Sequence, residues 1–193
     1  MQGIERRELL KRAGVGSVAL AAFPALGGSA WAHDRECGRT RFYFQALSGQ
    51  AATVGGGESI IMSGCGSFSD CAVRGGGEFV HFDGTKIPSP PVIATGSWRA
   101  TRFLSFTEIG TFGVNVSGIL EIEIKLVPCD GPVVRHASLV VVCNIGVAGL
   151  MTGRPEGFTL TVPGMKPFSP FHPELGLTVF TRPCEDDEEE EDD

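Results

Sequence analysis

The chain has 193 residues, of which 42% are hydrophobic, and a formal net charge of −7 at neutral pH. Nine of the acidic side chains are the last nine residues, 185–193, whereas residues 33–184 carry 12 basic and 12 acidic side chains. A neutral folded part argues against a nucleic-acid-binding protein, which needs clustered basic residues. It also excludes the uniformly acidic surface of a salt-adapted protein.

The first 32 residues have the features of an export signal. Arg6 and Arg7 are followed by Lys11 and then by an apolar run over residues 13–26, and the segment closes on a small-x-small pattern that ends at Ala32. This segment resembles a twin-arginine (Tat) signal peptide. A spanning helix needs about 20 strongly apolar residues, and this run is shorter and interrupted by glycine, serine and proline. We therefore expect cleavage after Ala32 and no stable membrane anchor.

The resemblance implies a compartment and two transient partners. A Tat leader would engage the Tat translocase and a signal peptidase, and it would place the mature chain in the periplasm or outside the cell. Residues 33–184 are long enough for one domain with its own core. The acidic tail 185–193 cannot bury apolar area, so we expect it to be disordered and solubilising. Loose capture of cations or of a basic partner is the alternative role.

The six cysteines all lie in the mature region, and an even number behind an export signal favours disulfides. One pair flanks a short turn, a second flanks a loop between two apolar segments, and the third would join the two ends of the domain. No Cys-x-x-Cys pair supports a zinc site. The sequence therefore predicts the bridges Cys65–Cys71, Cys129–Cys143 and Cys37–Cys184.

Hydrophobic periodicity predicts strands and no convincing helix after the leader. The clearest pattern covers residues 119–127, in which four apolar side chains alternate with Glu121, Glu123 and Lys125. We expect an all-β fold, an antiparallel barrel or sandwich stapled by disulfides. A barrel is preferred because closure removes free strand edges. The eight expected strands are 41–47, 59–64, 78–83, 97–106, 119–127, 138–144, 158–162 and 175–182.

A short internal repeat precedes two of these strands. Residues 55–58 and 75–78 both consist of three glycines and a glutamate. They lack the lysine and the following helix of a phosphate-binding P-loop. We therefore expect these glycines to permit bulges or a close approach of the backbone.

Three charged residues are candidates for catalysis. Glu58 and Glu78 hold equivalent places in the repeat, and Arg102 interrupts an apolar series. Facing inward, they could line the mouth of a barrel, where burial shifts pKa values toward those of acid–base catalysts. The competing interpretation is a structural ion pair between Arg102 and one glutamate.

Histidines offer a second candidate site. Cleavage after Ala32 would make His33 the amino terminus, which could chelate copper through its amino group and ring. His81, His136 or His172 would supply the further ligand, in the manner of lytic polysaccharide monooxygenases. The residues after His33 do not resemble those of that family, so copper is the alternative, and otherwise no cofactor is predicted.

The sequence therefore predicts an exported small β-domain with a binding or structural role. One alternative is a small barrel enzyme that uses its lumen, by architectural analogy with allene oxide cyclase-like or dirigent-like barrels. Another is a subunit that self-associates through an open strand edge.

Overall fold

A computed structural model of the chain describes residues 39–51, 55–171 and 176–182. Several expectations lie outside the described residues. They concern the leader 1–32, His33, His172, the proposed bridge Cys37–Cys184 and the tail 185–193.

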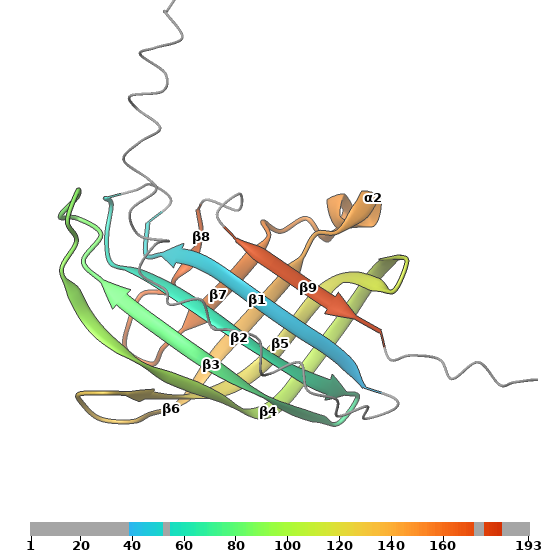
Figure 1. Cartoon of the computed structure of the whole chain (residues 1–193), viewed down its shortest axis with the longest axis horizontal. Coiled ribbons are helices and arrows are strands. Elements are labelled where there is room, and N and C mark those ends of the chain that lie inside the picture. The colour runs from blue at the N-terminus through green and yellow to red at the C-terminus, as the bar shows by residue number, and fades with distance from the viewer. Residues whose placement is uncertain (1–38, 52–54, 172–175, 183–193) are drawn as a thin grey trace, which may run out of the picture. The chain divides into compact units, whose positions relative to one another are not determined.

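The described part is built almost entirely of β-strands (Figure 1). A short helix α2 (Gly146–Gly149) and a 3-10 turn η2 (Leu150–Thr152) follow the sixth strand. None of the described helices is long and apolar enough to cross a membrane. The strands are β1 (Thr40–Gly49), β2 (Ser59–Ser69), β3 (Ala72–Phe82), β4 (Val92–Phe112), β5 (Asn115–Pro128), β6 (Val134–Cys143), β7 (Gly157–Thr161), β8 (Ser169–Pro170) and β9 (Leu177–Thr181).

The strands pair antiparallel in the order β4-β3-β2-β1-β9-β5-β6-β7, and β8 pairs with β1. Because β4 also pairs with β5 along most of its length, the pairings close into a ring. The predicted antiparallel all-β class is therefore confirmed. Local β-hairpins such as β2–β3 and β5–β6 need only short turns, and this agrees with the turn residues that separate the strands.

The apolar side chains that alternate along the strands form one core inside the ring. On β5, Leu120, Ile122 and Ile124 are fully buried, while the residues between them face outward, which confirms the pattern seen in the sequence. Phe44 of β1 contacts the rings of Trp98 and Phe158, each with centroids 5.7 Å away. Each such side chain contributes roughly 1.5–3 kcal/mol by leaving water.

Glycines let β2, β3 and β4 close around this core. A β-carbon on Gly64 would lie 2.1 Å from the ring of Trp98, and one on Gly77 would lie 1.9 Å from the carbonyl oxygen of Ser63. The indole nitrogen of Trp98 donates a hydrogen bond of 2.9 Å to that same carbonyl. The expected close backbone approach is thus confirmed for residues 75–77. The triplet 55–57, by contrast, lies in the loop before β2, so the two copies are not structurally equivalent.

The predicted bridges within the described residues are wrong, because Cys65, Cys71, Cys129 and Cys143 are free thiols. Cys65 lies inside β2 opposite Gly76, several residues before the turn that contains Cys71. Cys129 lies in the loop between β5 and β6, and Cys143 is the last residue of the 10-residue strand β6. At about 3.3 Å per residue, both separations exceed the roughly 7 Å between α-carbons that a disulfide spans. Sequence proximity to a turn was a poor guide to spatial pairing.

Candidate functional site on the outer face of β3 to β6

The structure does not bring the three candidate catalytic residues together. Glu58 precedes β2 and accepts hydrogen bonds from Gln50, at 3.2 Å, and from His81, at 3.0 Å. Glu78 is exposed on β3. Arg102 is exposed on β4 and pairs with Glu123, not with either predicted glutamate.

Strand phase explains this outcome. On β3 the odd-numbered residues face the core, so Phe79 is buried and Glu78 faces outward. On β4 the pairing with β5 shifts at bulges between Ala100 and Arg102 and between Phe103 and Ser105. A bulge adds one unpaired residue and changes the side to which later residues point. A simple period of two therefore placed Arg102 on the wrong face.

The two described candidate copper ligands also lie apart. His81 is on β3 and His136 is on β6, and each is bonded to a different glutamate. Within the described ranges, no group of three or more His, Cys, Asp or Glu side chains is placed to hold a metal ion.

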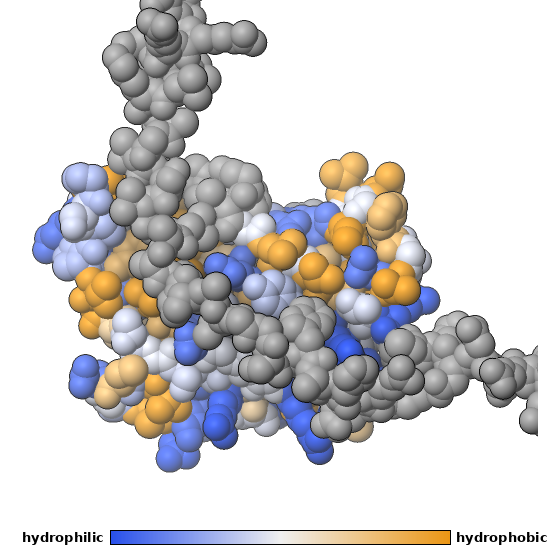
Figure 2. Space-filling model, in the orientation of Figure 1, coloured by the Kyte–Doolittle hydropathy of each residue, from blue (hydrophilic) through white to orange (hydrophobic). Residues whose placement is uncertain are grey.

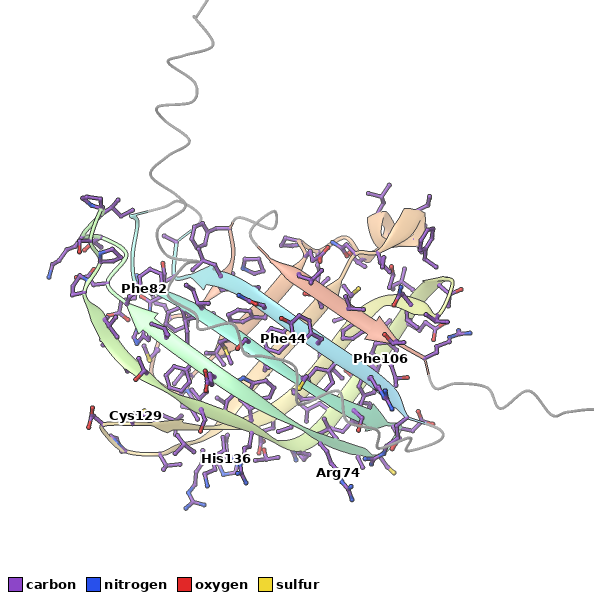
Figure 3. The ribbon with its side chains drawn as sticks, in the orientation of Figure 1. Phe44, Arg74, Phe82, Phe106, Cys129 and His136 are labelled. Atoms are coloured by element: carbon purple, nitrogen blue, oxygen red, sulfur yellow. The ribbon has the colours of Figure 1, made fainter. Side chains whose placement is uncertain are left out.

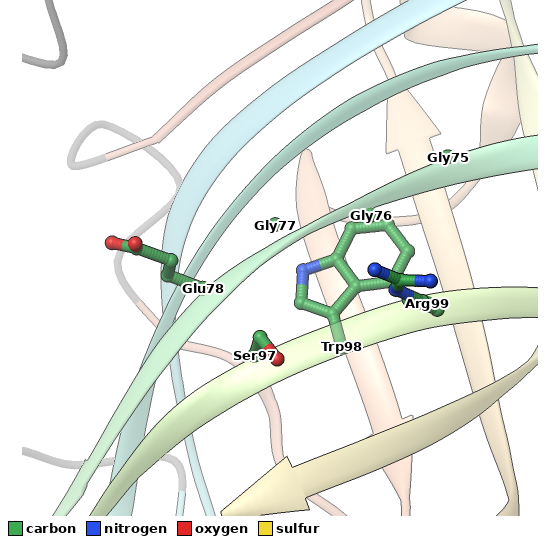
Figure 4. A pocket seen from close by; sticks show the side chains of 7 residues that line it. All are labelled: Gly75, Gly76, Gly77, Glu78, Ser97, Trp98 and Arg99. Atoms are coloured by element: carbon green, nitrogen blue, oxygen red, sulfur yellow. The ribbon is translucent and has the colours of Figure 1, made fainter. Parts of the chain in front are cut away.

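A hollow of about 540 Å³ lies on the outer face of β3 and β4 (Figure 4). Gly75, Gly76 and Gly77 line it with backbone alone, because glycine has no side chain. In Figure 4 the Glu78 carboxylate points away from these glycines, whereas the side chain of Arg99 lies beside Gly76, with its Cγ 3.6 Å from where a β-carbon on Gly76 would be. Gly64 of β2 admits the core tryptophan on the inside, and the three glycines of β3 leave backbone on the outside.

A second hollow of about 110 Å³ adjoins the first. Arg99 lines the first hollow, and its direct partner across the strands, Lys125, lines the second. The backbone of His136 has a φ of 61°, a left-handed conformation that histidine tolerates better than most residues. It lies where the pairing of β5 and β6 slips, beside Lys125 and Arg135. The lining residues are Thr101, Glu123, Lys125, Arg135 and His136.

Most of the positive charge around these hollows is not neutralised. Glu123 binds Nδ1 of His136 at 2.9 Å and a guanidinium nitrogen of Arg102 at 3.2 Å. The hydrogen bond from His136 holds the pKa of Glu123 below its usual value, and the charge of Arg102 acts in the same direction. Arg99, Lys125 and Arg135 form no ion pair with any residue of the described ranges.

We call these side chains the basic face: Arg99, Arg102, Lys125, Arg135 and His136. In Figure 2 hydrophilic side chains gather along the lower edge of the molecule, where Figure 3 labels His136 and Arg74. Glu78 and Glu123 are the carboxylates that line the two hollows. Such an arrangement can bind anionic groups through charge-assisted hydrogen bonds.

An apolar tip lies elsewhere on the ring. Val147 and Leu150 are each 84% exposed and Met151 is 77% exposed, all on α2 and η2. This tip carries no charged side chain, and it shares no residue with the basic face. It is a second surface of distinct chemistry.

Comparison of the chain with protein-family models, with curated proteins and with solved structures found no match. The basic face was missed in the sequence because its residues come from three strands. The signal in the sequence was that Lys125 and Arg99 both fall at outward positions of their strands. Whether the two side chains lie next to each other depends on the register between the strands.

Proposed function

We propose that this chain is an exported binding module that holds an extended anionic polymer on its basic face. The observation that carries the proposal is the cluster of Arg99, Lys125 and Arg135, three cations with no ion-pair partner among the described residues, beside an open hollow lined by glycines. The proposal that the protein is exported rests on the Tat-like leader, and residues 33–184 would form the mature domain. The polymer would be a polysaccharide bearing carboxylate or sulfate groups.

The finer architecture that we infer is a barrel rather than a sandwich. The closed circuit of pairings supports it, because a sandwich leaves edges between its two sheets. The aromatic and aliphatic side chains inside the ring form one continuous core. Large side chains such as Trp98 and Phe44 fill that interior, so binding is more readily placed on the outer face than in a lumen.

The shape of the site favours a polymer over a small ligand. The two hollows are adjacent and open, and together they extend across β3, β4, β5 and β6. Small-molecule sites are typically concave and enclose most of the ligand. A chain of anionic groups could instead contact successive cations across the strands, with hydroxyl groups of Ser97 and Thr101 alongside.

The test is a binding titration of the full chain with dextran sulfate, with uncharged dextran as the matched ligand. We expect binding of dextran sulfate that weakens as salt is added, because screening acts on exposed charges. The variant Arg99→Ala/Lys125→Ala/Arg135→Ala should bind about tenfold more weakly. Lys166→Ala, which removes an exposed lysine away from the site, should bind as the wild type does.

Three results would contradict the proposal. They are equal binding of dextran and dextran sulfate, unchanged affinity of the triple variant, and tighter binding of single-stranded DNA than of the polysaccharide. Circular dichroism of each variant checks that the strands are retained.

A further inference from the structure

The point at which the described chain ends is fixed beside a row of cations. The backbone N–H of Arg182 donates to the carbonyl of Val114 at 2.9 Å. The preceding residue, Thr181, pairs with Arg41 of β1. Residues 183–193 follow from this point, and nine of them, 185–193, are acidic.

A cationic track runs across the outer face from this point. Arg41 of β1 is opposite Ser67 of β2, which is opposite Arg74 of β3. Two residues further along β3, Gly76 is opposite Arg99 of β4, which is opposite Lys125 of β5. Arg135 comes next on β6. Neighbouring strands are about 4.8 Å apart, so the track from β1 to β6 covers roughly 24 Å. We define it as Arg41, Arg74, Arg99, Lys125 and Arg135.

The length of the remaining chain matches this track. Eleven residues extend up to roughly 36 Å, which is enough to carry the carboxylates from β9 to β6. The first acidic residue is only the third after Arg182. The tail carries nine acidic side chains and the track carries five basic ones, so the two are complementary in charge.

We propose that the acidic segment 185–193 occupies the basic face of its own chain and competes there with an external polyanion. The competition rests on the proposed function, whereas the contact between tail and face does not. A tethered segment acts at an effective concentration of about a millimolar, so even a weak contact keeps the face covered at low salt. A polymer with many more charges displaces the tail.

Carbodiimide coupling tests the contact directly, because it joins a carboxylate to an amine only where the two touch. In the full chain at low salt, we expect peptide mass spectrometry to find Lys125 joined to a residue of 185–193. Lys166 is the internal comparator and should couple much less. A variant in which Glu185 to Asp193 are all replaced by their amides (Glu→Gln, Asp→Asn) should give no such product, and added salt should suppress it.

Three outcomes would overturn the contact: no product at Lys125, equal products at Lys125 and Lys166, or products that join two chains. The third outcome would place the tail of a second copy on the face. Mixing isotopically labelled and unlabelled protein before coupling separates the products within one chain from those between chains.

The amide-tail variant then tests the competition. We expect it to bind dextran sulfate at least about threefold more tightly than the wild type at low salt, with the difference lost at high salt. If Lys125 couples to the tail but neither protein binds the polymer, the proposed function fails and the contact stands. If both proteins bind the polymer equally, the competition is wrong and the function stands.

Discussion

Glu156 shows how the surroundings of a single side chain alter its chemistry. Its carboxylate accepts the backbone N–H of Thr178 at 3.2 Å, and partial burial raises its pKa above the usual value. A raised pKa means that the folded state binds the proton more tightly than the unfolded chain does. Stability is therefore greatest below the unfolded pKa and falls as pH rises through the folded pKa.

The variant Glu156→Gln removes this titration and keeps an oxygen that can accept the hydrogen bond. We expect the free energy of unfolding of the wild type, relative to the variant, to fall as pH rises above the ordinary glutamate pKa of about 4.3 and through the raised pKa of the folded state. Urea unfolding at several pH values measures the difference. A difference that does not change with pH would contradict the assignment.

The four described thiols should differ sharply in reactivity. Cys65, Cys71 and Cys129 are exposed, whereas Cys143 is buried and its Sγ donates to the carbonyl of Thr178 at 3.2 Å. Burial also raises the pKa of Cys143, so less of the reactive thiolate forms. Iodoacetamide should label the three exposed thiols in folded protein, and Cys143 only after unfolding. Early labelling of Cys143, or bridges among these four, would show that the arrangement is wrong.

At the scale of elements, the two glycine triplets differ in what they contribute. Gly77 lies within β3, where a methyl group would meet backbone atoms of Ser63 and Gly64 at 1.9 and 2.6 Å. Gly57 lies in the loop before β2, where the closest contact would be an ordinary 3.4 Å. The sequence makes the triplets look equivalent, but only the second lies inside the sheet.

We therefore expect Gly77→Ala to destabilise the fold by about 3 kcal/mol or to prevent folding, because backbone cannot move aside as a side chain can. Gly57→Ala is the matched control and should change stability by less than about 0.5 kcal/mol. Thermal unfolding of the two variants measures this contrast. Equal stability of both variants would contradict the close packing of β2 against β3.

The elements that the sequence predicted best are those with a strict alternation. Residues 119–127 form part of β5 with the expected face buried, since a regular strand keeps its phase. The 21-residue strand β4 was predicted only in its middle. Its bulges break the alternation, and the residues that stabilise it are cross-strand partners that one sequence does not reveal.

At the scale of the whole molecule, the closure of the ring determines which residues lie near one another. It places Arg99, Lys125 and Arg135 side by side although they come from three strands. It also separates Glu58, Glu78 and Arg102, which a common periodicity had grouped. Residues 33–184 are neutral in sum, but this balance conceals a local cluster of cations whose position depends on the strand register.

The same closure leaves the molecule with two outward surfaces of different chemistry, the basic face and the apolar tip of α2 and η2. The central claim is that the first of them binds polyanions. The most direct measurement is the change in backbone amide chemical shifts of the full chain as dextran sulfate is added. We predict shifts concentrated at Gly76, Arg99, Lys125 and Arg135 that reverse with salt. Shifts centred on Val147, Leu150 and Met151, or none at the basic face, would contradict the claim.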